Sequence, residues 1–425
     1  MNYSKRVEWS KLDNASKIFP ATCSYKEPKV FRIACELFEP VDRDILQKAL
    51  DVTIEKFPLY KSVLRSGVFW FYFETSDIRP VVEEENNPVC APIYKQYERN
   101  LLFKVFYYKK RINMEVFHAL SDGTGALWFM KTLVYHYLLI KHRDELEGKV
   151  EELNYNASIS EKMDDSFMRH YPGWDVKKQF ARNKKGDKFK RAYHIKGSRN
   201  EEYRVKVIEG GMSAKAVLEL AHKYNTTMTV FLAALLITSI YQDMPRRKKK
   251  YPVVLSIPVN LRQFFKSETV RNFFSTINVG YSLKNKDLEL GEVIVSLNES
   301  FKRELTEESI SRHLNKLVFL ERNPLIRVVP LPLKKYVLRI ANMLVDMGIT
   351  AALSNVGRIE MPSGFEKYIS QFSVIPNVRR PQMAVCTYGD RLVVSFASPF
   401  RETELQKNFF RSLAEMGIKI DICSN

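Results

Sequence analysis

The sequence predicts an α+β fold divided between two domains. The chain has 425 residues, of which 45% are hydrophobic and 12% aromatic. It is therefore long and apolar enough to bury two cores, each formed by about 200 residues. Segments that alternate apolar and polar residues are mixed with segments whose apolar residues recur every three or four positions. Strands, helices and hairpins mixed in this way are typical of two-layer α/β sandwiches.

In the first half of the chain the patterns predict a loop or short helix at 9–20, strands at Lys29–Leu37, Val68–Glu74, Leu101–Tyr108 and 112–118, and helices at 40–57 and from Ser121 or Asp122 to Lys141. An acidic, polar stretch at 144–170 and a basic one at 182–200 follow, with little periodicity. We therefore predict a first domain at 1–180, a linker at 181–200 and a second domain at 201–425.

In the second half the same criteria predict strands at Tyr203–Ile208, Val253–Arg262, Phe273–Tyr281, 350–356, 382–388 and 391–397, and helices at Ser213–Lys223, Thr227–Asp243, 288–304, 306–320, 333–346 and 402–416. The helix at Thr227–Asp243 is apolar nearly all round, which predicts that it is buried.

The chain is strongly basic, with 67 lysines and arginines against 49 acidic residues and a net charge of +18. Such a balance favours anionic partners: nucleic acid, an anionic membrane, an acidic carrier protein or a polyanionic cofactor. Basic clusters occur at 182–191, 246–250 and 378–380. They lack a regular interleaving of aromatic residues, which argues against nucleic acid as the partner.

Several function classes have no support in the sequence. The five cysteines form no Cys-x-x-Cys pair, which suits free thiols in a reducing compartment. The N-terminus has no apolar signal segment, and the longest apolar run, Met228–Tyr241, is too short to span a bilayer. We expect a cytoplasmic protein without a transmembrane segment. Metal-ligand spacing, a Gly-rich phosphate loop and a Gly-x-Ser-x-Gly elbow are also missing from the sequence, so we expect no metal site.

The stretch 111–130 is the most informative one, because it predicts a strand that turns directly into a helix. His118 lies at this junction, beside the free N–H groups and the positive dipole end of the helix. A neutral imidazole there suits a general base, since its pKa already lies near neutrality. Taken alone, His118 is more simply a buried core histidine. The Asp-Gly pair at fixed spacing, Asp122-Gly123, reverses that preference.

His118-Ala-Leu-Ser-Asp122-Gly123 resembles the His-x-x-x-Asp-Gly signature of the condensation-domain and CoA-dependent acyltransferase superfamily. That group includes the bacterial alcohol-acetyltransferase-like proteins, which this chain resembles most, the plant BAHD acyltransferases and chloramphenicol acetyltransferase. Condensation domains usually carry a second histidine before the catalytic one, where this chain has Phe117. The departure favours acyl transfer over peptide condensation.

Three stretches of the second half also resemble the superfamily: Ser256–Arg262, Arg271-Asn272-Phe273 and Ser354–Arg358. The resemblance implies two chloramphenicol-acetyltransferase-like domains with an active-site tunnel between them and His118 midway along it. It also implies a salt bridge between Asp122 and Arg262.

Other residues receive supporting roles. We expect Gly123 to allow a close approach of the backbone at the helix start, where its N–H helps to hold an oxyanion. Ser354 and Asn355 are candidates for oxyanion or channel contacts, with an ordinary turn at a strand end as the simpler interpretation. For Asp122 the simpler interpretation is an N-cap, which is compatible with the salt bridge.

The resemblance implies a CoA-dependent O-acyltransferase, with acyl-CoA as co-substrate, a small-molecule hydroxyl as acceptor and no permanently bound cofactor. His118 acts as general base without a covalent intermediate. One alternative takes the acyl group from an acyl carrier protein or uses an amine acceptor. A further alternative is a non-catalytic anion-binding protein on the same scaffold. The residues that bind CoA cannot be assigned from the sequence, although one of the basic clusters suits its phosphates.

Overall fold

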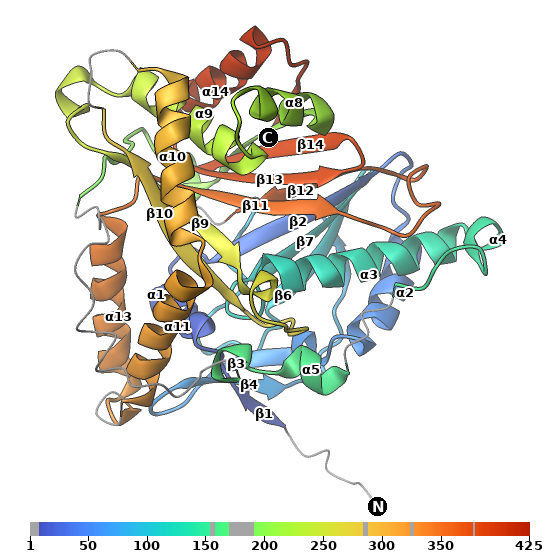
Figure 1. Ribbon diagram of the computed structural model, residues 1–425. Helices are drawn as coiled ribbons and strands as arrows, with labels where there is room; N and C mark the ends of the chain where they lie inside the picture. The colour runs from blue at the N-terminus through green and yellow to red at the C-terminus, as the bar shows by residue number, and fades with distance from the viewer. Residues whose placement is uncertain (1–7, 154–157, 170–190, 284–287, 324–326, 377–378) are drawn as a thin grey trace, which may run out of the picture.

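The computed structural model describes residues 8–425 apart from 154–157, 170–190, 284–287, 324–326 and 377–378. Half of the predicted linker, 181–190, therefore lies outside the described residues. Figure 1 shows the two larger sheets in the middle of the molecule with helices around them. The mixed helix and sheet architecture confirms the predicted fold class.

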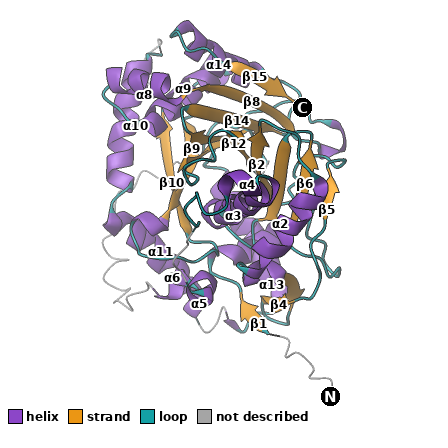
Figure 2. Ribbon diagram, turned by 90° about the vertical axis from the view of Figure 1, so that its right-hand side faces the viewer, coloured by secondary structure: helices purple, strands orange, loops and turns teal. Residues whose placement is uncertain are grey.

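A five-stranded sheet is built mainly from the first half of the chain. Its strands lie in the order β12 (Ile369–Ile375), β2 (Val30–Leu37), β7 (Arg111–Phe117), β6 (Phe103–Tyr108) and β5 (Val82–Glu84). The hairpin predicted between β6 and β7 is confirmed, with Tyr108 opposite Arg111. Two helices, α2 (Arg43–Glu55) and α3 (Gly123–Lys141), pack on each other and against this sheet (Figure 2).

A seven-stranded sheet is built from the second half of the chain. Its order is β10 (Phe274–Tyr281), β9 (Val253–Asn260), β11 (Ala351–Ile359), β13 (Gln382–Tyr388), β14 (Arg391–Ser398), β8 (Lys206–Ser213) and β15 (Asp421–Ser424). The neighbouring helices are α8 (Ala214–Lys223), α9 (Met228–Asp243), α10 (Leu290–Glu304) and α14 (Glu404–Glu415). The remaining helices are α1 (Ile18–Thr22), α4 (Arg143–Leu146), α5 (Ile159–Met163), α6 (Ser166–Arg169), α11 (Glu307–Arg322) and α13 (Leu331–Asp346).

One strand of the first sheet comes from the second half of the chain. β12 runs antiparallel to β2, with Ile375 opposite Arg32 and Ile369 opposite Leu37. The sequence pattern predicts no strand here, because Ser370, Gln371 and Ser373 interrupt the apolar residues. The partner of β12 is distant in sequence, so local periodicity gives little information about the pairing. The two halves of the chain are therefore joined within one sheet.

The strand predicted at Val68–Glu74 is confirmed from Phe71 onward, but its predicted start is wrong and the strand that precedes it was not predicted. The structure has a hairpin of β3 (Ser62–Ser66) and β4 (Phe71–Thr75), which forms a separate three-stranded sheet with β1 (Trp9–Lys11). The turn closes at Gly67, whose N–H donates a 2.8 Å hydrogen bond to the Trp70 carbonyl. A side chain there would place Cβ 2.9 Å from the same oxygen, so glycine permits the turn.

Helix α9 is buried along almost its whole length, as its apolar composition predicted. In the described part of the chain, no single helix is long and apolar enough to cross a membrane. Helices α8 and α9 taken together, which are bent by 81° at the break between them, are long and apolar enough to do so, by length and composition only.

Candidate active site

His118 is positioned by the junction between β7 and α3. β7 pairs with β2, so Phe117 lies opposite Val30, and the His118 N–H donates a 2.8 Å hydrogen bond to the Lys29 carbonyl. Helix α3 begins at Gly123, with Asp122 as its N-cap in extended conformation. The strand-to-helix junction predicted for this stretch is therefore present.

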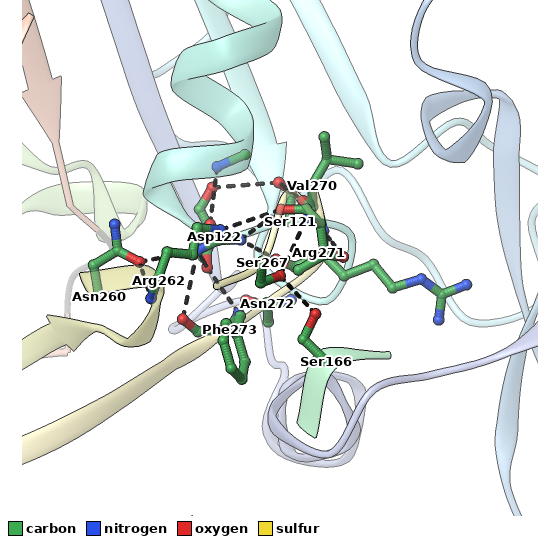
Figure 3. Close-up of polar contacts among 12 residues, drawn as sticks. Ser121, Asp122, Ser166, Asn260, Arg262, Ser267, Val270, Arg271, Asn272 and Phe273 are labelled. Atoms are coloured by element: carbon green, nitrogen blue, oxygen red, sulfur yellow. Dashed lines mark hydrogen bonds and ion pairs between the residues drawn. The ribbon is translucent and has the colours of Figure 1, made fainter. Parts of the chain in front are cut away.

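Asp122 joins the start of α3 to the second half of the chain. One carboxylate oxygen, Oδ1, accepts the Gly125 N–H at 2.9 Å, which caps the helix. The other, Oδ2, accepts the Arg262 Nη1 at 2.8 Å and the Phe273 N–H at 2.8 Å (Figure 3). Both side chains of the ion pair are more than nine-tenths buried. The N-cap and the salt bridge anticipated for Asp122 thus coexist.

Arg262 uses its other donors to fix the segment that follows it. Its Nη2 donates at 2.8 Å to the carbonyls of both Thr269 and Arg271, and its Nε donates to the Thr269 carbonyl at 3.2 Å. From the opposite side, the Ser121 hydroxyl donates to the Val270 carbonyl at 2.6 Å. Segment 267–273 is therefore held against the first turn of α3 (Figure 3).

Asn272 lies on this segment and hydrogen-bonds to His118. Its amide nitrogen lies 2.9 Å from the His118 carbonyl oxygen and 2.9 Å from the Ser16 hydroxyl. A carbonyl oxygen only accepts, so the orientation of the amide is fixed. Asn272 Oδ1 then lies 3.1 Å from His118 Nδ1. Because Oδ1 also only accepts, Nδ1 carries the proton, and the lone pair of the neutral ring is on Nε2.

Apolar surroundings keep the His118 ring neutral. Phe19 stacks on it with ring centroids 4.3 Å apart, and Phe31 lies 5.0 Å away on another side. Burial is the largest effect and lowers the pKa of His118 below its ordinary 6.5, with Lys29 adding to this in the same direction. Asp122 and Asn272 oppose the effect more weakly.

A buried carboxyl group lies beyond Asn272. The Ser16 hydroxyl accepts from Asn272 and donates to the Asp13 carboxylate, whose other oxygen accepts the Ser16 N–H at 2.7 Å. Burial raises the pKa of Asp13 to about 6, against the lowering effect of these hydrogen bonds. The imidazole is therefore the inner end of a hydrogen-bonded chain that runs from His118 through Asn272 and Ser16 to Asp13.

Several solved structures have a fold similar to that of this chain. Polyketide synthase associated protein 5 from Mycobacterium tuberculosis matches with a TM-score of 0.63 and 12% identity, over 95% of this chain and 96% of the other. A Fusarium sporotrichioides structure complexed with coenzyme A and T-2 matches with a TM-score of 0.64 and 11% identity, over 97% and 99%. The first condensation domain of the CDA synthetase gives 0.62 and 13%, over 97% and 96%.

The chain has the fold of the condensation-domain and CoA-dependent acyltransferase superfamily. No protein-family model matches the sequence, and no curated protein matches it at the level of sequence. The identities of 11–13% explain why, since the likeness resides in the arrangement of the strands and helices rather than in the residues.

The remaining predicted site residues are Gly123, Ser354 and Asn355. Apart from its chain neighbours and the backbone of its own helix, no described residue comes within 4 Å of where a Cβ on Gly123 would lie. A Cβ on Gly125 would lie 2.2 Å from the Val270 carbonyl oxygen. The close approach by protein backbone that we expected at Gly123 therefore occurs at Gly125. The Asn355 amide on β11 donates to the Thr229 hydroxyl at 2.8 Å, and the neighbouring Ser354 is half-buried.

Two groups that hold the imidazole, Asn272 and Phe19, are not predicted as site residues from the sequence. Asn272 belongs to a turn that resembles the superfamily, and Phe19 belongs to the N-terminal segment at 9–20. Both meet His118 through long-range packing, which leaves no periodic trace in the sequence. Among the described residues, no group of three or more His, Cys, Asp or Glu side chains could hold a metal ion.

Proposed function

We propose that the protein is an acyltransferase that moves an acyl group from acyl-CoA to an alcohol hydroxyl, with His118 as general base. The observation that carries the proposal is the hydrogen bond between His118 Nδ1 and Asn272 Oδ1, which leaves the lone pair of the neutral ring on Nε2. Burial favours this neutral form, because it lowers the pKa of His118. Structures with the same fold that are complexed with coenzyme A support the choice of donor.

The proposed reaction needs no covalent acyl-enzyme. Nε2 of His118 takes the proton from the acceptor hydroxyl as its oxygen attacks the thioester carbonyl carbon. The tetrahedral intermediate collapses when the C–S bond breaks, and the imidazolium returns its proton to the leaving thiolate. The products are the ester and free CoA. The enzyme supplies the base and holds the two substrates beside it.

Asp122 and Arg262 are positioning residues in this proposal. Their ion pair fixes the loop that carries His118 and the segment that carries Asn272. Gly123, Ser354 and Asn355 are proposed to line the path of the substrates and to offer donors to the developing oxyanion. We also propose two domains, 1–180 and 201–425, with a linker at 181–200 and a tunnel between the domains that passes His118.

A second candidate function is transfer from an acyl carrier protein, or to an amine. It is favoured by the condensation domains among the structures with this fold and by the net charge of +18, which suits an acidic carrier. The alternative of a non-catalytic anion-binding protein predicts salt-sensitive retention of anions without thioester turnover.

The decisive experiment measures release of free thiol from acetyl-CoA and longer acyl-CoAs in the presence of a panel of alcohols, for the parent and for His118→Ala. We expect turnover by the parent and a loss of at least about 100-fold in His118→Ala, because proton transfer by a positioned base contributes that much or more. The variant should keep the melting temperature of the parent.

Parallel assays with acyl carrier protein as donor, and with amines as acceptors, decide between the two enzymatic candidates. Turnover that is unchanged in His118→Ala would contradict the proposed role of the imidazole. The lack of turnover with every donor and acceptor class, combined with anion binding, would favour the non-catalytic alternative.

A further inference from the structure

The outer face of α13 is an apolar stripe that no described residue covers. The helix lies at the edge of the molecule (Figure 1), and its inner side packs on α1, where Arg339 Nε donates to the Ala21 carbonyl at 2.9 Å. Six outward apolar side chains recur every three or four residues and are each 39–63% exposed: Leu333, Tyr336, Val337, Ile340, Met343 and Leu344. An amphipathic helix with its apolar face outward needs a covering partner.

The apolar surface continues onto the turn between β3 and β4. Val68 and Phe69 at its tip are 71% and 44% exposed. The Leu331 N–H donates to the Val68 carbonyl at 2.8 Å, and Lys334 Nζ donates to the Phe69 carbonyl at 3.1 Å. The turn and the first residues of α13 are thus tied together, so the two apolar parts form one surface.

A basic pocket lies at the other end of the same helix. It has a volume of about 240 Å³, and Met343 and Met347 of the helix line it together with Arg199, Arg379 and Arg380. The carboxylate in its wall, that of Asp346, is ion-paired with Arg379 and Arg380. Arg379 also lies 4.0 Å from a carboxylate oxygen of Glu27, so three guanidinium groups against two carboxylates leave one net positive charge; His194 lines the pocket as well.

Positive charge also flanks the stripe along its length. From Arg327 to the end of the helix at Asp346 the chain has four basic residues and one acidic residue, Asp346 itself. Arg327, before the helix, and Arg339, at the edge of the stripe, are both exposed. Apolar side chains bordered by arginines, with a cationic pocket at one end, match the acyl region and the phosphate head groups of an anionic bilayer.

We propose that α13, the turn at Val68 and Phe69, and the pocket beside Arg199 bind the protein to the surface of an anionic phospholipid bilayer. The apolar stripe lies among the acyl chains near the head groups, and the pocket holds a lipid phosphate. The proposal does not rest on the proposed acyl transfer. It would place the bilayer on the side of the molecule that carries α1, and hence close to Phe19, which stacks on His118.

The charge distribution favours a bilayer over a second copy of the chain. Pairing of two α13 stripes would bring together two molecules of net charge +18 at surfaces that are themselves basic. An anionic bilayer neutralises this charge instead. Each arginine near the bilayer surface strengthens binding by about fivefold.

The test is co-sedimentation of the full chain with vesicles of phosphatidylcholine alone, or mixed with phosphatidylglycerol, at low and high salt. We expect binding to the mixed vesicles that weakens with salt. Val337→Glu should weaken it by about tenfold or more, because it places a charge among the acyl chains. The matched control is Val295→Glu on α10, where a valine of similar exposure, 61% against 56%, lies outside the stripe. This variant should bind like the parent.

The pocket is tested separately with Arg199→Gln, since Arg199 is exposed and lies outside the ion pairs of Asp346. We expect binding to fall about fivefold. No binding of the parent to mixed vesicles, or equal binding of Val337→Glu and Val295→Glu, would overturn the proposal. A dimer that Val337→Glu dissociates, without vesicle binding, would assign the stripe to a second copy. Unchanged vesicle binding by Arg199→Gln, with weaker binding of CoA, would assign the pocket to the co-substrate.

Discussion

Asn272 is the residue that determines which nitrogen of the candidate base carries the proton. Its amide accepts the Nδ1 proton of His118 and donates to the His118 carbonyl, so it holds both the ring and the backbone of one residue. Because burial lowers the pKa of His118 below 6.5, the folded chain binds fewer protons than the unfolded chain just below that pH. The contribution of His118 to stability should therefore fall as the pH drops through 6.5, and activity should fall at the lower pH where the folded ring takes up a proton.

Asn272→Asp should move the acid limb of kcat/KM to higher pH. A carboxylate beside the Nδ1 proton stabilises the imidazolium and raises the pKa of His118, so more of the enzyme is inactive at a given acid pH. Asn272→Ala removes the acceptor and should lower kcat by about 100-fold through misorientation of the ring. The measurement is a pH profile for each variant.

A purely structural role for Asn272 predicts a different result, namely lower activity at every pH with the limb unmoved. That result in Asn272→Asp, at a melting temperature equal to that of the parent, would show that the amide does not set the protonation of His118.

At the scale of elements, the first turn of α3 is a point of close contact between the two halves of the chain. Segment 267–273 lies against it, with the Val270 carbonyl hydrogen-bonded to Ser121 and facing Gly125. A Cβ on Gly125 would lie 2.2 Å from that carbonyl oxygen and 2.4 Å from the Ser121 hydroxyl. Segment 267–273 can therefore lie this close to α3 only because residue 125 has no side chain.

Gly125→Ala should lower the free energy of unfolding by about 1–3 kcal/mol, because backbone on one side must shift. Gly123→Ala, two residues earlier in the same turn, is the matched control. Apart from its chain neighbours and the backbone of its own helix, its Cβ would meet no described residue within 4 Å, so the helix should be unchanged or stabilised by up to about 1 kcal/mol. Urea unfolding of the two variants checks the difference. Equal stability of the pair would mean that the segment is not held closely against α3.

Strand pairing and buried ion pairs are among the contacts that join the two halves of the molecule. β12 completes the first sheet, the Asp122–Arg262 ion pair is buried between α3 and the segment after β9, and Arg111 on β7 pairs with Glu209 on β8 at 3.0 Å. Since the Asp122–Arg262 pair holds the segment that carries Asn272 beside His118, the geometry of the candidate base depends on the assembly of both halves.

Asp122→Ala should cost about 3–5 kcal/mol of stability, because it leaves the Arg262 guanidinium buried without its carboxylate. Activity should fall with it, since the cap of α3 is also lost. Asp51→Ala removes a partner from an exposed ion pair with Arg79 and should have a much smaller effect on thermal unfolding. The double variant Asp122→Ala/Arg262→Ala should lose less than the sum of its parts. Additive losses would contradict a direct coupling between the two side chains.

Most of the secondary structure and the core of the candidate site were predictable from the sequence. The junction of β7 and α3 shows up in local spacing: three alternating apolar residues, a capping residue and a helical apolar pattern. The positions of His118 and Asp122 were predictable because both residues lie between the end of β7 and the start of α3. β12 and the turn at Gly67 were missed, because a polar strand and a tight turn depend on partners and space that periodicity does not encode.

The sequence by itself determined the α+β class, the burial of α9 and the position of the candidate base at a strand end, because these depend on neighbours within a few residues. Only the tertiary structure decided which nitrogen of His118 carries the proton and which glycine is tightly packed. It also decided that the apolar stripe of α13 faces outward. Each of these depends on groups that are distant in the chain and meet only when both halves have packed together.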